Sequence, residues 1–530
     1  MKISVKHILA LGLLLLLPLQ KNAKAQSNGD GPPPATPRVP RGIYALVSVE
    51  KALNTETTLL RQECRGGIPI TDCREGLTIA GSNTYLSDLY TELLKNPAVS
   101  GLALQVHWDL LNPNPPGPEV SNAYFWDFVD DAFASVNAWN SSHPDAKVPK
   151  TIQLIVSAGF NSPQWVLLQP GLTPSCDGLF YDPPVPPGST CGYATFTSSG
   201  EKGDTEGGDS PELPMPWNTS YNQAWTTFLQ ALAARYNDNP SLVSISVAGP
   251  TASSVEMIVP NGNNDNQLQF APDGNPEISP NSMWDQLLMN AGFTETDQAF
   301  IDAWDKAIDT YGGIFKGLTL VATTGNGLPK LSATGSFAPP TEPIDFAPDC
   351  TGAENMDCQA ESTILSYFVE PSVGGFNAKA TQTSGLKKVS SGTGGYLGII
   401  GVRYLSQQTA APSTETTRIL GGAQFDKSVA KSPEDEGSSP IVEQALYNVL
   451  QDFFTGTKVG SEYCVPKVQP DASGSAPLNY LQIFYEDFQY AASHPMAMVN
   501  ECGVSTLTTA QQELNTASKQ LLEISEPWQP

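Results

Sequence analysis

Short apolar segments alternate with amphipathic segments along most of the chain. The apolar segments have the length and composition of buried β-strands; they are residues 43–49, 101–108, 152–157, 242–248, 318–322, 376–380, 419–425 and 480–485. Apolar residues recur at helical spacing in residues 86–94, 125–139, 221–236, 297–311, 362–368, 441–454 and 511–524. Residues 397–404 are a rival for the seventh strand. This order, strand then helix, predicts an α/β fold in which a parallel sheet closes into a (β/α)8 TIM barrel.

An open, doubly wound sheet is the structural alternative to a barrel. Such a sheet normally carries a glycine-rich phosphate turn after its first strand, whereas Val49-Glu50-Lys51 follow here. Long segments rich in Gly, Pro, Asn and Ser follow the third, fourth and fifth strands, at residues 159–217, 249–281 and 325–357. Segments that follow strands lie on the C-terminal face, where barrel enzymes hold their active sites. We therefore expect one barrel domain over residues 41–530 with a binding cleft on that face.

The N-terminus has the pattern of a secretory signal peptide over residues 1–25. Two lysines precede an apolar run at residues 8–19, and a small-x-small cleavage signal ends at Ala25. A Pro-rich spacer follows at residues 26–40, and no later segment has the roughly 18 continuous apolar residues of a membrane span. We expect a secreted or periplasmic protein without a membrane span after cleavage; an uncleaved anchor is the alternative.

The eight cysteines agree with export, because disulfides persist in oxidising compartments. Sequence proximity favours disulfides that staple the long loops, although other connectivities are open. The favoured pairs are Cys64–Cys73, Cys176–Cys191, Cys350–Cys358 and Cys464–Cys502. A zinc site is disfavoured because no CxxC pair exists and few histidines are present.

The net charge and the sequence motifs limit the classes of ligand and partner that we expect for this protein. A net charge of −26 repels nucleic acid and anionic lipid and suits a neutral or cationic substrate, although solubility alone also explains it. No nucleotide, flavin or haem signature and no G-x-S-x-G elbow stands out. No cofactor is therefore expected; calcium in the Asn/Asp-rich residues 261–266 is a weakly supported possibility.

Three carboxylates follow predicted strands and are candidates for glycosidic-bond chemistry, which usually needs two carboxyl groups beside the bond. Glu256 follows the fourth strand, between the apolar residues Val255 and Met257 that favour its protonated form. Glu486 ends the eighth strand, and Asp426 follows the seventh. Each of the three is equally open to interpretation as a solvated loop carboxylate.

Aromatic and amide side chains cluster after the same strands and suit sugars, which have apolar faces and polar edges. Two of these residues have an alternative role. In it, Trp108 packs under a loop, and His107 is a barrel residue whose hydrogen bonds are satisfied within the protein. Trp165 is equally open to a core role. The candidate substrate-binding residues are His107, Trp108, Asn161, Gln164, Trp165 and Tyr485.

The stretches QVHWDLLNP, LIVSAGFNSPQWV and ARYNDNPSLVSISVAGP resemble barrel glycoside hydrolases of clan A, the group with cellulases and β-galactosidases. The resemblance covers roughly residues 41–260. It implies a retaining mechanism, with Glu256 as acid/base and a nucleophile after the seventh strand. Clan members commonly show Asn-Glu at the end of strand four, where this chain reads Gly249-Pro250-Thr251, and the seventh strand offers Gln424 and Asp426 but no clear Glu.

Three functions follow from these observations. The first is a glycoside hydrolase with a carbohydrate substrate. The second is a catalytically inactive barrel that binds glycans, which the missing Asn-Glu favours. The third is a structural envelope protein that uses its acidic surface for partner contacts.

Overall fold

The computed structural model describes a set of segments that all belong to one compact unit, residues 36–530. The described segments are residues 38–53, 82–117, 123–173, 175–176, 191–198, 212–252, 254–260, 268–269, 284, 287–288, 296–328, 364, 367–368, 378–384, 419–424, 457–459, 462–465, 478–493 and 509–524.

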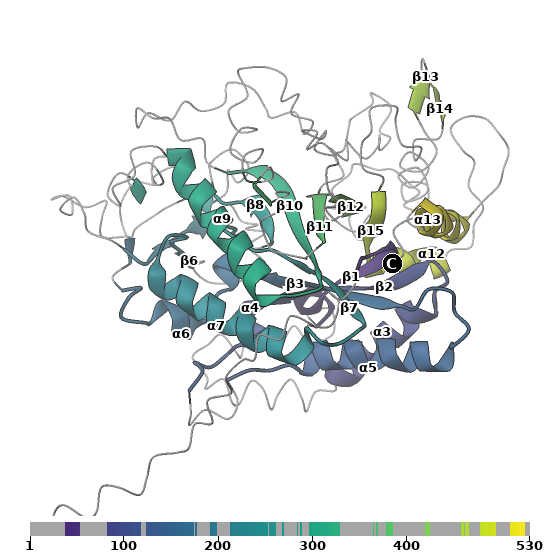
Figure 1. The fold of residues 1–530 in the computed structure, drawn as a ribbon, viewed down its shortest axis with the longest axis horizontal. Coiled ribbons are helices and arrows are strands. Elements are labelled where there is room, and N and C mark those ends of the chain that lie inside the picture. Colours follow the sequence, from purple (N-terminus) through teal and green to yellow (C-terminus); the bar gives the residue numbers. More distant parts are fainter. Residues whose placement is uncertain are drawn as a thin grey trace, which may run out of the picture. The chain divides into compact units, whose positions relative to one another are not determined.

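Eight parallel strands form a closed ring of pairings, which makes the protein an α/β barrel. In ring order they are β1 (Gly42–Ser48), β2 (Val99–His107), β3 (Thr151–Ser157), β7 (Leu242–Ser246), β10 (Thr319–Gly327), β11 (Lys379–Ser384), β12 (Ile419–Gln424) and β15 (Leu478–Phe484), and they can be followed in Figure 1. Each strand pairs with the next, and β15 pairs back with β1.

All eight predicted strands are therefore found, each overlapping its predicted range. Residues 419–424 occupy the seventh position, and the rival residues 397–404 lie outside the described residues. Several strands of the ring are buried on both faces, as every residue of β1 and of β7 illustrates. This double burial explains why they read as continuous apolar runs rather than alternating ones.

One short strand extends the wall of the barrel. β7 ends at Ser246, whereas its neighbour β10 continues to Gly327. β8 (Glu256–Ile258) pairs parallel with this continuation of β10. Three antiparallel pairs lie outside the ring: β4 (Tyr193–Thr195) with β6 (Glu212–Pro214), β5 (Thr197–Ser198) with β9 (Leu268–Gln269), and β13 (Thr457–Val459) with β14 (Glu462–Val465).

Helices pack on the outside of the strands. They are α3 (Ser82–Lys95), α5 (Asp127–Ser142), α7 (Thr219–Tyr236), α9 (Thr296–Ile314), α12 (Tyr485–Ser493) and α13 (Ala510–Ile524). α3 packs on β2 and α5, α7 on α9, and α13 on β1 and β15. The predicted helix at 362–368 has helical residues at 364, 367 and 368, and residues 441–454 lie outside the described residues.

Local sequence sets the ends of α7. The side chain of Asn218 accepts a hydrogen bond from the backbone N–H of Tyr221 (3.0 Å) and so caps the first turn. After the helix, the side chain of Asn239 accepts from the backbone N–H of Ser241 (3.0 Å), which stabilises the turn into β7. The sequence Asn237-Asp238-Asn239-Pro240 at this point consists of typical turn residues.

The lumen of the barrel contains a polar network in place of the branched apolar layers usual for this fold. Gln482 on β15 donates to Gln153 on β3, although two strands separate them in the ring, so both side chains point inward. Gln382 on β11 donates to Gln424 (2.8 Å) and to Gln482 (3.0 Å), and it accepts from the Tyr480 hydroxyl (2.8 Å). These bonds fix which face of each strand is interior.

No helix within the described residues is long and apolar enough to cross a membrane.

Candidate functional site

The carboxyl end of the barrel, meaning the ends of the eight strands and the segments that follow them, gathers most of the chemistry-bearing residues. The inward-pointing glutamines show which other residues face the interior of the barrel. Gln153 lies on the same face of β3 as Ser157, and Gln382 is paired in register with Thr323. His107 is paired with Ser157, and Glu256 is paired with Thr323. Paired residues of neighbouring strands share a face, so His107 and Glu256 both lie on the interior face at this end.

Glu256 is the first residue of β8 and has intermediate exposure. Its neighbours Val255 and Met257 are buried, and its backbone N–H donates to the Ser254 hydroxyl oxygen (3.0 Å). The extension of the barrel wall by β8, rather than a free loop, positions this carboxylate. A strand residue is held more firmly than a loop residue, as a catalytic group requires.

A histidine between two carboxylates lies at the ends of β1 and β2. Nε2 of His107 is 3.5 Å from Oε2 of Glu50, and Nδ1 is 4.0 Å from Oδ1 of Asp109. Glu50 also accepts from the backbone N–H of His107 (3.0 Å). The Glu50 side chain is only 4% exposed. His107 is itself only 7% exposed, so His107 and Glu50 form a buried pair.

Glu50 is a residue of this end that the sequence interpretation did not single out. It is the first acidic residue after the first strand, in the sequence VSVEKAL. A search of all eight strand ends for the first carboxylate, rather than of the fourth, seventh and eighth alone, would have found it.

Glu486 lies in the first turn of α12, directly after β15, and is 8% exposed. Its neighbours Tyr485 and Asp487 are 2% and 0% exposed. Acidic residues in a first helical turn interact favourably with the helix dipole, so the position of this carboxylate also has a structural cause. Asp426, the third candidate, lies outside the described residues.

The aromatic candidates lie behind the strand ends, in a packed cluster. Trp108 begins α4 (Trp108–Leu111), has no exposed surface, and packs against Trp165, Tyr221 and Trp225, with ring centroids 4.8–6.4 Å apart. Its ring is thus buried against Trp165 and against two aromatic residues of α7, so Trp108 is a packing residue with no surface left for a sugar. The Trp165 indole N–H donates to the carbonyl oxygen of Asn112 (2.8 Å).

The two amide candidates differ in exposure. Asn161 ends η1 (Gly159–Asn161) and is 5% exposed, whereas Gln164 begins α6 (Gln164–Leu167) and is exposed. Both follow β3, as the sequence predicts. Of the two, Gln164 has its side chain available to a ligand in solution.

Within the part of the chain that the structure describes, two buried hydroxyls at the carboxyl end have no hydrogen-bond partner: Ser157 Oγ and Thr323 Oγ1, each 0% exposed. Buried polar groups are almost always paired, and leaving one unpaired costs about 1–3 kcal/mol. Ser157 is paired in register with His107, and Thr323 with Glu256. The interior of the barrel is therefore polar at this end, beneath the candidate carboxylate and imidazole.

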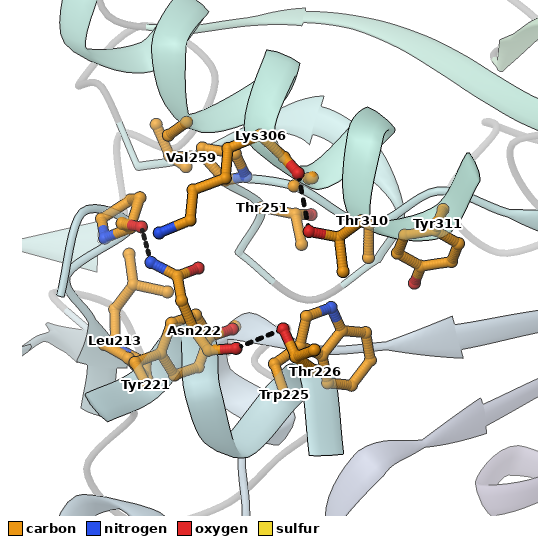
Figure 2. A pocket seen from close by; sticks show the side chains of 18 residues that line it. Leu213, Tyr221, Asn222, Trp225, Thr226, Thr251, Val259, Lys306, Thr310 and Tyr311 are labelled. Carbon is orange, nitrogen blue, oxygen red and sulfur yellow. Dashed lines mark hydrogen bonds between the residues drawn. The ribbon is translucent and has the colours of Figure 1, made fainter. Parts of the chain in front are cut away.

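A cleft lies outside the ring of strands, between α7, α9 and the turn that follows β7 (Figure 2). It encloses about 590 Å³, counting the part that is open to solvent. None of the predicted site residues lines it. We place the candidate active site at the carboxyl end of the barrel instead, because the carboxylates and the imidazole gather there.

Cys176 and Cys191 form a disulfide bond, as predicted. It joins the segment after α6 to the segment before β4, and therefore staples the long connection between β3 and α7. Cys464 lies in β14, and the remaining predicted pairs each include a cysteine outside the described residues. Among the described residues, no group of three or more His, Cys, Asp or Glu side chains is placed to hold a metal ion.

Comparisons with known proteins give weak structural similarities. No family model and no curated protein sequence matches the chain. A GH5-4 broad-specificity endoglucanase from an uncultured bacterium is similar over 83% of this chain and 84% of its own, at 10% identity and a TM-score of 0.35. The β-galactosidase of the psychrophilic Marinomonas ef1 is 9% identical over 92% of this chain, which spans 60% of that protein, with a TM-score of 0.31.

Endo-glycoceramidase II from Rhodococcus sp. is 11% identical over 59% of this chain and 63% of its own, with a TM-score of 0.23. These solved neighbours are glycoside hydrolases. Similarities at this level establish no function, so the fold assignment rests on the pairing of the strands.

Proposed function

We propose that the protein is a secreted glycoside hydrolase whose active site lies at the carboxyl end of the barrel. Glu256 is the proton donor, and Glu486 or Asp426 is the second carboxylate. The observation that carries the proposal is the register of β8, which pairs Glu256 with Thr323 on the inward face of the wall. That position follows the fourth barrel strand, which is the place where the resemblance to clan A hydrolases puts the acid/base.

The chemistry needs one carboxyl group that protonates the leaving oxygen and one that acts as nucleophile or base. Glu256 is half-buried on the inward face of the wall, which places its carboxyl group where a proton donor to a bound substrate is needed. Ser157, Thr323 and His107, all buried, lie on the same inward face at this end, so the barrel interior beneath Glu256 is polar.

A barrel that binds glycans without cleaving them is the second candidate. Gly249 stands where clan members commonly carry the asparagine of Asn-Glu, and a Cβ atom there would come within 2.5 Å of the Trp304 ring. Trp304 therefore leaves no room for an asparagine at this position. A hydrolase with this chain must orient its substrate without that amide.

The test is reducing-sugar release by the mature protein on plant, fungal and bacterial polysaccharides. Glu256→Gln and Glu486→Gln remove one carboxylate each and keep its size. Glu92→Gln, at an exposed position on α3, is the matched control. We expect release to fall at least about 100-fold in Glu256→Gln, as for loss of a general acid, and to be unchanged in Glu92→Gln.

Undiminished release by Glu256→Gln would remove that residue from the chemistry. If neither the wild type nor any variant releases sugar but the wild type binds one of the glycans, the inactive barrel is correct. If no polysaccharide is either cleaved or bound, both proposals are wrong.

A further inference from the structure

The cleft between α7 and α9 is lined by four polar side chains that solvent can reach. Asn222 and Thr226 lie on α7, and Lys306 and Thr310 lie on α9. In Figure 2, the Lys306 side chain extends from α9 toward Asn222 across the cleft. Trp225 and Val259, both buried, form part of the apolar lining.

The amide of Asn222 has already used its donor groups. Its nitrogen donates to the carbonyl oxygens of Pro216 and Asn218, both at 2.9 Å. An amide NH2 group has two hydrogens, so neither remains for a ligand. The amide oxygen, which accepts hydrogen bonds, is the part left for a ligand.

The hydroxyl groups of Thr226 and Thr310 have also used their donor hydrogens. The Thr226 hydroxyl donates to the carbonyl oxygen of Asn222 (2.7 Å), and the Thr310 hydroxyl donates to that of Lys306 (2.8 Å). Each hydroxyl has one hydrogen and two lone pairs, so each keeps only acceptor capacity. These four side chains therefore present three acceptor oxygens and one donor, the Lys306 ammonium, to the cleft.

We propose that this cleft is a second carbohydrate site, which takes one uncharged sugar unit outside the barrel. Sugar hydroxyls donate to Asn222 Oδ1, Thr226 Oγ1 and Thr310 Oγ1, and a sugar oxygen accepts from Lys306. The half-buried Ala303 and Ala307 of α9, which also line the cleft, supply apolar contacts for the carbon atoms of a pyranose. The proposal does not depend on hydrolysis at the carboxyl end of the barrel.

The same count of donors and acceptors selects against other ligands. An anion brings further lone pairs against three acceptor oxygens, and a single exposed lysine does not offset them. A ligand without hydroxyl or amine groups leaves the three acceptors unmatched. Because the cleft is partly open to solvent, we expect weak binding, with a dissociation constant of about 1–10 mM.

Isothermal titration calorimetry tests the proposal with methyl β-D-glucopyranoside and methyl β-D-galactopyranoside, and with glucuronate as the anionic counterpart. Thr226→Val and Thr310→Val remove the acceptors at nearly constant volume. Thr227→Val is a matched control, because Thr227 is the next residue on α7, makes the same bond to its own helix (2.9 Å to Gln223 O), and does not line the cleft.

We expect one of the neutral pyranosides to bind and its affinity to fall about tenfold in the Thr226→Val/Thr310→Val double variant, with Thr227→Val unchanged. The melting temperature of each variant shows that it is folded. Absence of binding by both pyranosides at about 50 mM would overturn the proposal. Equal affinity in the wild type and the double variant, or tighter binding of glucuronate, would also overturn it. A pyranoside bound at the carboxyl end alone gives the equal-affinity result, so the two sites are distinguished.

Discussion

Basic side chains bind carbonyl oxygens at the amino end of the barrel, whereas acidic side chains gather at the carboxyl end. At the amino end, Arg38 donates to the carbonyl oxygens of Asn237, Asn239 and Gly317, and Lys150 donates to those of Asn96 and Val99. At the carboxyl end, the corresponding groups are acids: Glu50, Asp109, Glu256 and Glu486. In a parallel barrel, helices end beside the strand starts and begin beside the strand ends. Helix termini therefore favour bases at one end and acids at the other.

The comparison shows which acids need a functional explanation. Asp109 and Glu486 lie in first helical turns, so the helix dipole already accounts for them. Glu256 lies on a strand and faces inward beside an unpaired hydroxyl. Glu50 also lies in a first helical turn, so of the four acids named above Glu256 is the one that helix polarity does not explain.

The packing of the lumen also differs between the ends. At the amino end, a Cβ atom on Gly101 would lie 2.0 Å from the Thr151 carbonyl oxygen and 2.8 Å from the Tyr44 ring. The Tyr44 hydroxyl bonds the Thr151 hydroxyl (2.7 Å). The amino end is closed by tight packing, whereas the carboxyl end keeps the unpaired hydroxyls of Ser157 and Thr323.

Gly101→Ala should have the largest effect, because the new methyl group meets main-chain atoms that cannot move aside. We expect a loss of about 3 kcal/mol or more in the free energy of unfolding, measured by urea denaturation. Gly313→Ala adds the same methyl group in α9, where nothing lies within 4 Å, and should be neutral or stabilise by up to about 1 kcal/mol. Equal stability of the two variants would show that the amino end is not tightly packed.

Arg38→Met should have the next largest effect. The change leaves the carbonyl oxygens of Asn237, Asn239 and Gly317 without this donor, and we expect a loss of about 2 kcal/mol in urea denaturation. Arg235→Met provides the comparison: the Arg235–Asp130 pair is exposed on the surface and should be worth less than about 1 kcal/mol. A loss in Arg235→Met as large as in Arg38→Met would contradict a special role for the amino end.

The smallest effect concerns Lys150, where burial lowers the pKa to about 8 from 10.5. Between these values, the unfolded chain holds a proton that the folded chain has released, so stability rises with pH across this window. Relative to Lys150→Met, the wild type should gain about 1–2 kcal/mol between about pH 7.5 and 9.5. A constant difference between the two proteins over that range would show that Lys150 keeps its ordinary pKa.

Strands such as β1, β2 and β3 could be predicted from sequence because burial on both faces makes them largely apolar runs. β11, with the sequence KATQTS, overlaps its predicted range only at its first two residues. The helices of the first half were predicted for a similar reason, since an amphipathic face repeats at 3.6 residues. β8 was not predicted, because a strand of three residues is too short to show a periodic pattern of apolar and polar positions. Its pairing depends on the extra length of β10, which is a tertiary property.

The location of the candidate site could be predicted from the sequence, but the roles of its individual residues could be predicted less well. Glu256 and His107 follow strands, and strand ends meet at one end of any barrel. The burial of Trp108 could not be predicted, because its neighbours Tyr221 and Trp225 lie more than a hundred positions away. The glutamine network was missed for the same reason: its four glutamines lie on strands that are far apart in the sequence.

The most direct test of the account measures hydrolysis and stability together in Glu256→Gln and Arg38→Met. The account predicts that Glu256→Gln unfolds at the same urea concentration as the wild type but releases little or no sugar. Arg38→Met should unfold at lower urea yet release sugar at the wild-type rate per folded molecule. Full activity in Glu256→Gln, or an inactive but fully folded Arg38→Met, would contradict the assignment of function to the carboxyl end and of stability to the amino end.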